Sequence, residues 1–219
     1  MEADTVAGLL SGTSAHAPRL CRAGLAVLFT LRLSALVVGA RTLWWDEVGD
    51  LACNASAESC RRTCFDAAFP ISPFSLFALQ LVVIFSHALA SSWHFRPRGE
   101  GMGSWLQPTL RGKQQRLWLH LGSLLAKAVL EGVFLVTFHT LYSHFPVLVQ
   151  CPPSPPCSPA VTCAILNAGE KDAFNHFMAG SSWACLLLSL LGTQHAAVQI
   201  FQEASGKAPR KGTARKLSV

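Results

Sequence analysis

Six cysteines in two groups of three are the residues of this sequence most able to do chemistry. Their spacings are C-x6-C-x3-C for Cys53, Cys60 and Cys64, and C-x5-C-x5-C for Cys151, Cys157 and Cys163. Three thiolates can bind zinc, but structural zinc sites favour closely spaced pairs of the C-x2-C kind. An even number of cysteines in an oxidising compartment instead predicts disulfides, although spacing alone leaves the pairing open. Bridges between the two groups are attractive because they would join two loops into one rigid platform.

These cysteines need a scaffold, and the distribution of charge predicts a membrane bundle. Charged residues make up 14% of the 219 residues and apolar residues 51%, whereas typical soluble domains have ~25% charged residues. A helix that crosses a bilayer needs about 20 apolar residues. Four stretches, 23–40, 69–95, 117–145 and 173–202, meet that length with at most two charged residues each. A soluble four-helix core would need a charged face on each helix, and these stretches lack one.

Lysine and arginine residues give the four spans an orientation. Twelve lie in or beside the two ends and the middle loop, against four in or beside the other two loops. Because positive charge favours the cytoplasmic side, we predict cytoplasmic ends and a cytoplasmic middle loop. The predicted segments are an N-terminal segment 1–19, spans 20–43, 74–93, 117–141 and 177–201, extracellular loops 44–73 and 142–176, a cytoplasmic loop 94–116 and a tail 202–219.

The predicted fold is therefore an all-α membrane protein with four transmembrane helices. A disulfide-linked extracellular cap of two loops covers them, because both cysteine groups fall in those loops. A small β element in the cap is expected, since short bridged loops often pair as hairpins. The basic tail is expected to face anionic lipid headgroups rather than nucleic acid. No loop combines a nucleophile with a base, and no Gly-rich phosphate loop is present, so neither an enzyme nor a cofactor is predicted.

Charged residues inside the spans form a second candidate site. Arg32 lies in the first span, and Lys127 and Glu131 lie one helical turn apart in the third. A lone charge in a membrane is costly and needs a partner or water. Arg32 could be a pore charge that sets ion selectivity or one half of an ion pair with Glu131. We favour the ion pair.

Several motifs in the loops and spans follow the pattern of a known family. The first loop contains Cys53-Asn54, Cys60 and Cys64-Phe65-Asp66, then Phe69-Pro70-Ile71-Ser72 and Ala78-Leu79-Gln80, with Trp44, Asp46 and Glu47 before them. The second loop contains Cys163, Glu170-Lys171, Phe174 and Phe177-Met178. With these motifs the chain resembles the connexins, the subunits of gap-junction channels, over nearly its whole length. The short tail and its ending Leu217-Ser218-Val219 are most similar to the small beta group, of which this chain would be a divergent member.

The resemblance implies a pairing of the cysteines and a mode of assembly. The implied disulfides are Cys53–Cys163, Cys60–Cys157 and Cys64–Cys151. Six subunits, either all of this chain or mixed with other connexins, would form a plasma-membrane hemichannel. Two hemichannels would dock across the gap between cells into a channel that passes ions and small metabolites.

The resemblance also implies residues that line or gate the pore. Residues 1–18, which include Glu2, would fold into the cytoplasmic mouth with a flexible turn at Gly12. Arg41, Asp46 and Glu47 would lie at the outer end of the first span. Acidic residues there help the family bind calcium, so a calcium site near Glu47 is an expectation, although Thr42 and Trp45 depart from the family pattern. No other metal is expected.

The docking surface is where this chain departs most from the family. The candidate docking residues are Asn54, Ser56, Ser158 and Thr162, and the stretch 158–162 lacks the Asn and Asp that form hydrogen bonds across the gap. Asn54-Ala55-Ser56 is also an N-x-S acceptor sequence for a glycan. Because of these two features, an undocked hemichannel is an alternative to a gap-junction channel. A non-conducting tetraspan adhesion protein remains a third alternative, but claudin-like proteins carry two cysteines in the first loop, and none is required in the second.

Overall fold

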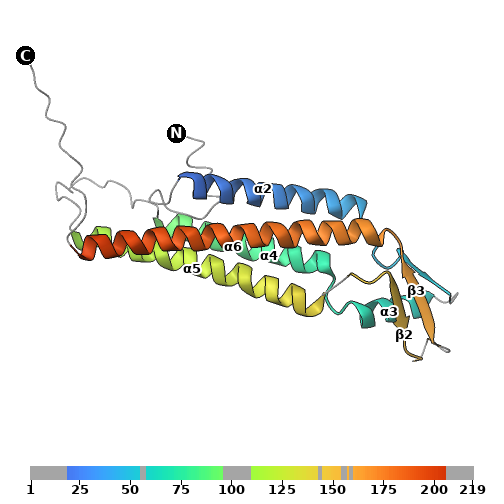
Figure 1. Cartoon of the computed structure of the whole chain (residues 1–219). Coiled ribbons are helices and arrows are strands. Elements are labelled where there is room, and N and C mark those ends of the chain that lie inside the picture. The colour runs from blue at the N-terminus through green and yellow to red at the C-terminus, as the bar shows by residue number, and fades with distance from the viewer. Residues whose placement is uncertain are drawn as a thin grey trace, which may run out of the picture.

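A computed structural model describes residues 19–54, 58–95, 110–142, 145–153, 157 and 160–205. Four long helices dominate it, namely α2 (Arg19–Thr42), α4 (Pro73–Phe95), α5 (Leu110–Leu141) and α6 (Ala168–Ala204). They run side by side, and a small cap lies beyond one end of the bundle (Figure 1). All four are long and apolar enough to cross a membrane, which confirms the predicted four-helix membrane fold.

The four helices form a closed ring of neighbours. Helix α6 packs against α2 and α5, and α4 packs against the same two helices from the other side. Many large apolar side chains, such as Val82 and Leu187, remain exposed on the outside of the single chain. Such a surface suits contact with lipid or with other subunits rather than with water. Helices α5 and α6 begin before the predicted spans, at Leu110 and Ala168, so both extend beyond the expected membrane segments.

The cap contains a three-stranded antiparallel sheet in the order β1-β3-β2. Strand β1 (Leu51–Cys53) comes from the first loop, and β2 (Leu148–Cys151) and β3 (Val161–Ile165) come from the second. In β3 the side chains of Val161, Cys163 and Ile165 are buried, as expected for alternation across one face of a sheet. The expected β element is therefore confirmed, with β3 as the shared central strand.

The cap also contains a helix that the sequence analysis did not anticipate. Helix α3 (Glu58–Ala68) carries Glu58 in its first turn, and Arg62 Nη2 donates to Glu58 Oε1 at 3.0 Å four residues later. An acidic first turn and an i, i+4 ion pair both favour a helix. Cys60 and Cys64 are also four residues apart, so they share the buried face of α3.

Two local features join the cap to the bundle. Asn167 has a φ of 55° between β3 and α6, a left-handed conformation that asparagine tolerates better than most residues. Gly39 of α2 lies so close to α6 that a Cβ at this position would be 2.7 Å from the Phe174 ring. Glycine therefore allows α2 and α6 to approach closely just below the cap.

Candidate functional site

Three disulfides join the two extracellular loops. They pair Cys53 with Cys163, Cys60 with Cys157 and Cys64 with Cys151, with Cα–Cα distances of 4.0, 5.0 and 5.6 Å. These are the three pairs that the connexin resemblance implies. The first bridge links directly opposed residues of β1 and β3, and the other two attach the buried face of α3 to the second loop. Sheet hydrogen bonds and disulfides therefore hold the same two loops.

Sulfur atoms of three cysteines gather within 4.8 Å of one another, namely those of Cys64, Cys151 and Cys163. Every one of these sulfur atoms belongs to a disulfide. A disulfide sulfur is not a thiolate and does not bind zinc as one. In the described part of the chain, no other set of three His, Cys, Asp or Glu side chains brings its ligand atoms this close. The expected calcium site near Glu47 stays a prediction.

A buried polar cluster joins the four helices of the bundle. Arg32 Nη1 of α2 lies 2.9 Å from Glu131 Oε1 of α5, and the two residues are 1% and 0% exposed. Gln80 Nε2 of α4 donates to Glu131 Oε2 at 2.7 Å and to Ser182 Oγ of α6 at 3.1 Å. Lys127 is also buried. The arrangement places Arg32 inside the subunit, as an inter-helix ion pair requires, rather than on its surface.

Gln80 and Ser182 are members of this cluster that the sequence analysis did not identify as such. Both are polar residues within the candidate membrane spans, and that polarity is a signal that the sequence offers. A buried amide or hydroxyl group has to find a hydrogen-bond partner. That requirement predicts some contact for Gln80, but only the helix arrangement identifies Glu131 as its acceptor.

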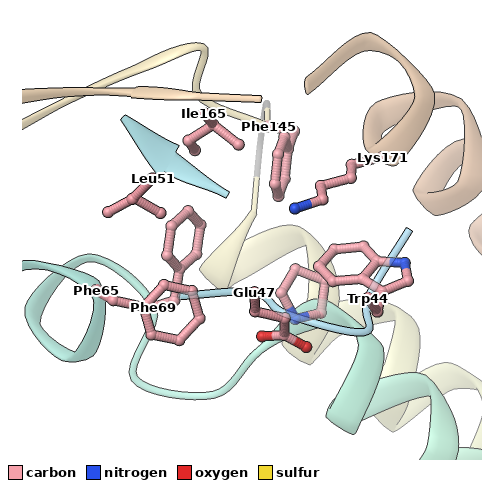
Figure 2. Close-up of a pocket in the computed structure, with 9 residues that line it drawn as sticks. Trp44, Glu47, Leu51, Phe65, Phe69, Phe145, Ile165 and Lys171 are labelled. Atoms are coloured by element: carbon pink, nitrogen blue, oxygen red, sulfur yellow. The ribbon is translucent and has the colours of Figure 1, made fainter. Parts of the chain in front are cut away.

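An aromatic cluster lies where the cap meets the bundle. The Trp44 ring is buried among Phe74, Phe145 and Phe174, with ring centroids 6.0 to 6.2 Å apart. Figure 2 shows the small pocket beside it, which is lined by Phe65 and Phe69 of the first loop and Ile165 of the second. Aromatic rings at these distances stabilise one another beyond the area they bury. The cluster therefore fixes the angle at which the cap joins α2 and α6.

Lys171 connects this cluster to the first loop. Its Nζ lies 2.5 Å from Asp50 Oδ2 and 5.2 Å from the centroid of the Trp44 ring, and its side chain reaches into the pocket of Figure 2. A buried ammonium group needs such a carboxylate and π partner. Asp50 was not among the predicted site residues. The preceding acidic Asp46 and Glu47 gave the only hint of a charged turn there.

The outer end of α2 places the expected pore-lining residues in different environments. Arg41 is exposed, and Asp46 Oδ1 accepts a hydrogen bond from the Gly49 backbone N–H at 2.8 Å. Glu47 is half-buried, and its Oε1 accepts a hydrogen bond from Ser72 Oγ at 2.8 Å. Burial raises the pKa of Glu47 above its usual value, the Ser72 hydrogen bond and Lys171 oppose the rise, and Asp50 adds to it. Glu2 and Gly12 lie outside the described residues.

Tyr142 follows α5 and forms a further link to the first loop. Its hydroxyl group donates a hydrogen bond to the Ile71 carbonyl oxygen. Burial, with a smaller contribution from Glu47, raises the pKa of Tyr142 to about 12. The phenol therefore stays protonated, and able to donate this hydrogen bond, at any physiological pH.

The structure brings together two of the four expected docking residues. Asn54 is exposed at the end of β1, and its side-chain oxygen accepts a hydrogen bond from the Thr162 backbone N–H at 3.3 Å. The Asn54 backbone N–H donates to the Thr162 carbonyl oxygen at 3.2 Å. Ser56 and Ser158 lie outside the described residues.

One comparison with known proteins gives a match that spans most of the chain. A family model whose description is Connexin matches residues 2–100 and 98–198. The matched regions contain helices α2, α4 and α5, most of α6, both cysteine groups and the cap.

Proposed function

The chain belongs to the connexin family, and from this premise we propose that six copies form a hemichannel that docks with a hemichannel of the adjacent cell. The family is one of channel-forming proteins rather than enzymes. With four candidate spans, the chain is a multi-pass plasma-membrane protein of the gap junction. The proposed channel passes ions and small metabolites.

The observation that carries this proposal is the construction of the cap. A docking surface has to keep its shape while the loops leave water and meet a partner, because ordering mobile loops on binding is costly. Here two loops share one sheet. One disulfide joins two strands of that sheet, and two more fasten α3 to the second loop. Such a cap is preorganised for repeated contacts around a ring of subunits.

A second candidate function is an undocked hemichannel, and the exposure of Asn54 favours it. The side chain of Asn54 lies at an exposed edge of the cap, where a transferase could reach it. A glycan there would be bulky and hydrophilic on the proposed docking face. The stretch 158–162 also contains no Asn or Asp. In the family, such residues form hydrogen bonds with the docked hemichannel across the gap.

Electrical recording from paired communication-deficient cells tests the proposal, with current across each cell's own membrane recorded in parallel. Junctional current in the wild type would support docking. Current across single cells that rises when external calcium is removed, without junctional current, would support the undocked hemichannel. Absence of both currents, with the protein shown at the cell surface, would overturn the channel proposal in favour of a non-conducting tetraspan protein.

Three variants separate the effect of the glycan from the effect of the Asn54 side chain. Ser56→Ala removes the acceptor sequence and keeps Asn54, whereas Ser56→Thr keeps the acceptor sequence and is the matched control. Asn54→Gln removes both the glycan and the side-chain contact with Thr162. If a glycan blocks docking, Ser56→Ala gains junctional current and shifts to lower mass, and Ser56→Thr does neither. Equal behaviour of Ser56→Ala and the wild type would show that no glycan controls docking.

A further inference from the structure

The outer ends of α5 and α6 border a second cavity, which is distinct from the pocket beside Trp44. It has about 350 Å³ of empty space, part of it open to solvent. Its polar lining residues are His139 of α5, Tyr142 just after α5, and Asp172, Asn175 and His176 of α6. The Tyr142 hydroxyl group already donates to the Ile71 carbonyl oxygen. His139 and His176 are exposed, so the cavity is accessible from the extracellular side of the bundle.

Asn175 is the feature of this cavity that calls for an explanation. The residue is only 2% exposed, and within the described residues neither its amide oxygen nor its amide nitrogen has a hydrogen-bond partner. Buried amide groups in folded proteins are almost always satisfied. A ligand or its hydration water in the cavity would provide the missing partner.

Asp172 and His176 are already arranged as a pair on one face of α6. His176 Nδ1 lies 2.9 Å from the Asp172 backbone oxygen and 3.4 Å from Asp172 Oδ2. The 3.4 Å between Nδ1 and Oδ2 is about the separation of two ligand atoms that each lie ~2.0–2.2 Å from one tetrahedral zinc ion. Zinc bound to Nδ1 and Oδ2 would replace the contact of Nδ1 with the backbone oxygen.

We propose that this cavity is a zinc site, with His139, Asp172 and His176 as ligands and the Asn175 amide beside the bound ion. Two imidazoles and one carboxylate are a typical zinc ligand set with room for a water molecule. Calcium prefers a shell made of oxygen atoms, so these imidazoles discriminate against it. The site would take zinc from outside the cell and would join the outer ends of α5 and α6.

One side chain has to move to close this site. The ligand atoms of His139, Asp172 and His176 do not all lie within 4.8 Å of one another. His139 is exposed in the last turn of α5, and exposed side chains change rotamer within nanoseconds. Zinc would therefore meet the Asp172–His176 pair first, and rotation of the His139 side chain would complete the site.

Titration of zinc chloride into purified full-length protein in lipid nanodiscs, followed by calorimetry, tests the proposal. We expect one zinc ion per subunit and an affinity at least tenfold weaker in both His139→Ala and His176→Ala. His195→Ala is the matched control, because His195 is an exposed histidine of the same α6 helix that does not line the cavity. Its affinity should equal that of the wild type, and excess calcium should not displace the zinc.

Two outcomes would overturn the proposal. Equal zinc affinity in all three variants and the wild type would show that the cavity holds water only. Loss of affinity in His176→Ala without loss in His139→Ala would remove α5 from the site. His139→Gln and His176→Gln, checked for intact folding by size-exclusion chromatography, replace any alanine variant that aggregates. Calorimetry measures zinc binding without ionic current, so its result does not depend on whether the proposed channel conducts.

Discussion

The extracellular cap and the membrane bundle hold distant segments of the chain together by different means. In the cap, disulfides bridge sequence separations of 110, 97 and 87 residues. In the bundle, the two described cysteines, Cys21 and Cys185, are free, and one buried polar cluster around Glu131 contacts all four helices.

The difference follows from the surroundings of each region. Lipid tails are as apolar as leucine, so helices in a bilayer gain little from burying apolar side chains against one another and depend on packing and polar contacts. The cap faces the oxidising exterior and is too small for a large core, a situation in which disulfides are favoured. Each region therefore depends on a few specific links that mutation can remove one at a time.

Removal of one cap disulfide is expected to have the largest effect. Cys60→Ser should destabilise the cap by about 2–5 kcal/mol, because the bridge to Cys157 restricts a long loop of the unfolded chain. We expect little of this variant at the cell surface in biotinylation assays. Cys21→Ala is the control that removes a free cysteine from the bundle, and it should reach the surface normally. Equal surface levels for the two variants would contradict a structural role of the bridge.

Removal of one partner of the buried ion pair is expected to have an effect of comparable size. Glu131→Ala leaves Arg32 buried without its carboxylate, which should cost about 3–5 kcal/mol. The double variant Arg32→Met with Glu131→Leu should recover part of that loss, because the buried guanidinium group is removed together with its carboxylate partner. Thermal unfolding of purified protein, monitored by intrinsic tryptophan fluorescence, measures both. A double variant as unstable as Glu131→Ala would show that the charge itself is needed for the fold.

A clash at the junction of the two regions should have an intermediate effect. Gly39→Ala forces a shift of α2 against Phe174, with an expected cost of about 1–3 kcal/mol. Gly132→Ala in α5 is the matched control, because its added Cβ meets no atom within 4 Å. It should be neutral or slightly stabilising. The measurement is the melting temperature of each variant, which tests packing at the junction against packing in the bundle. Equal melting temperatures for Gly39→Ala and Gly132→Ala would contradict a close approach of α2 and α6 at Gly39.

The smallest expected effect is the pH dependence from Glu47. Its pKa in the folded state is raised by burial, so its contribution to stability is fully present below the unfolded pKa of about 4.3 and is lost as the pH rises through the folded value. Glu47→Gln cannot ionise. Its melting temperature relative to wild type should therefore be higher at pH 7 than at pH 4. A difference that stays constant or falls over this range would contradict the raised pKa.

The sequence by itself determined the architecture of this protein, because the features that specify it are local. Long uncharged stretches predict helices in a membrane, and the positions of lysine and arginine orient them. The six cysteines indicate a disulfide-linked cap, and their family pattern implied the pairs that the structure contains. Arg32 and Glu131 were recognisable as partners because an isolated charge in a membrane is costly.

Only the tertiary structure decided which other distant polar groups meet. Gln80 and Ser182 converge with Glu131, and Asp50 receives Lys171, because α4, α5, α6 and the cap bring them there. Helix α3 has six polar or charged residues among its eleven, so its apolar pattern does not predict a helix. The disulfides of Cys60 and Cys64 hold one face of this helix in the buried interior of the cap. Contacts of this kind depend on the relative positions of whole elements, and no spacing along the chain records those positions.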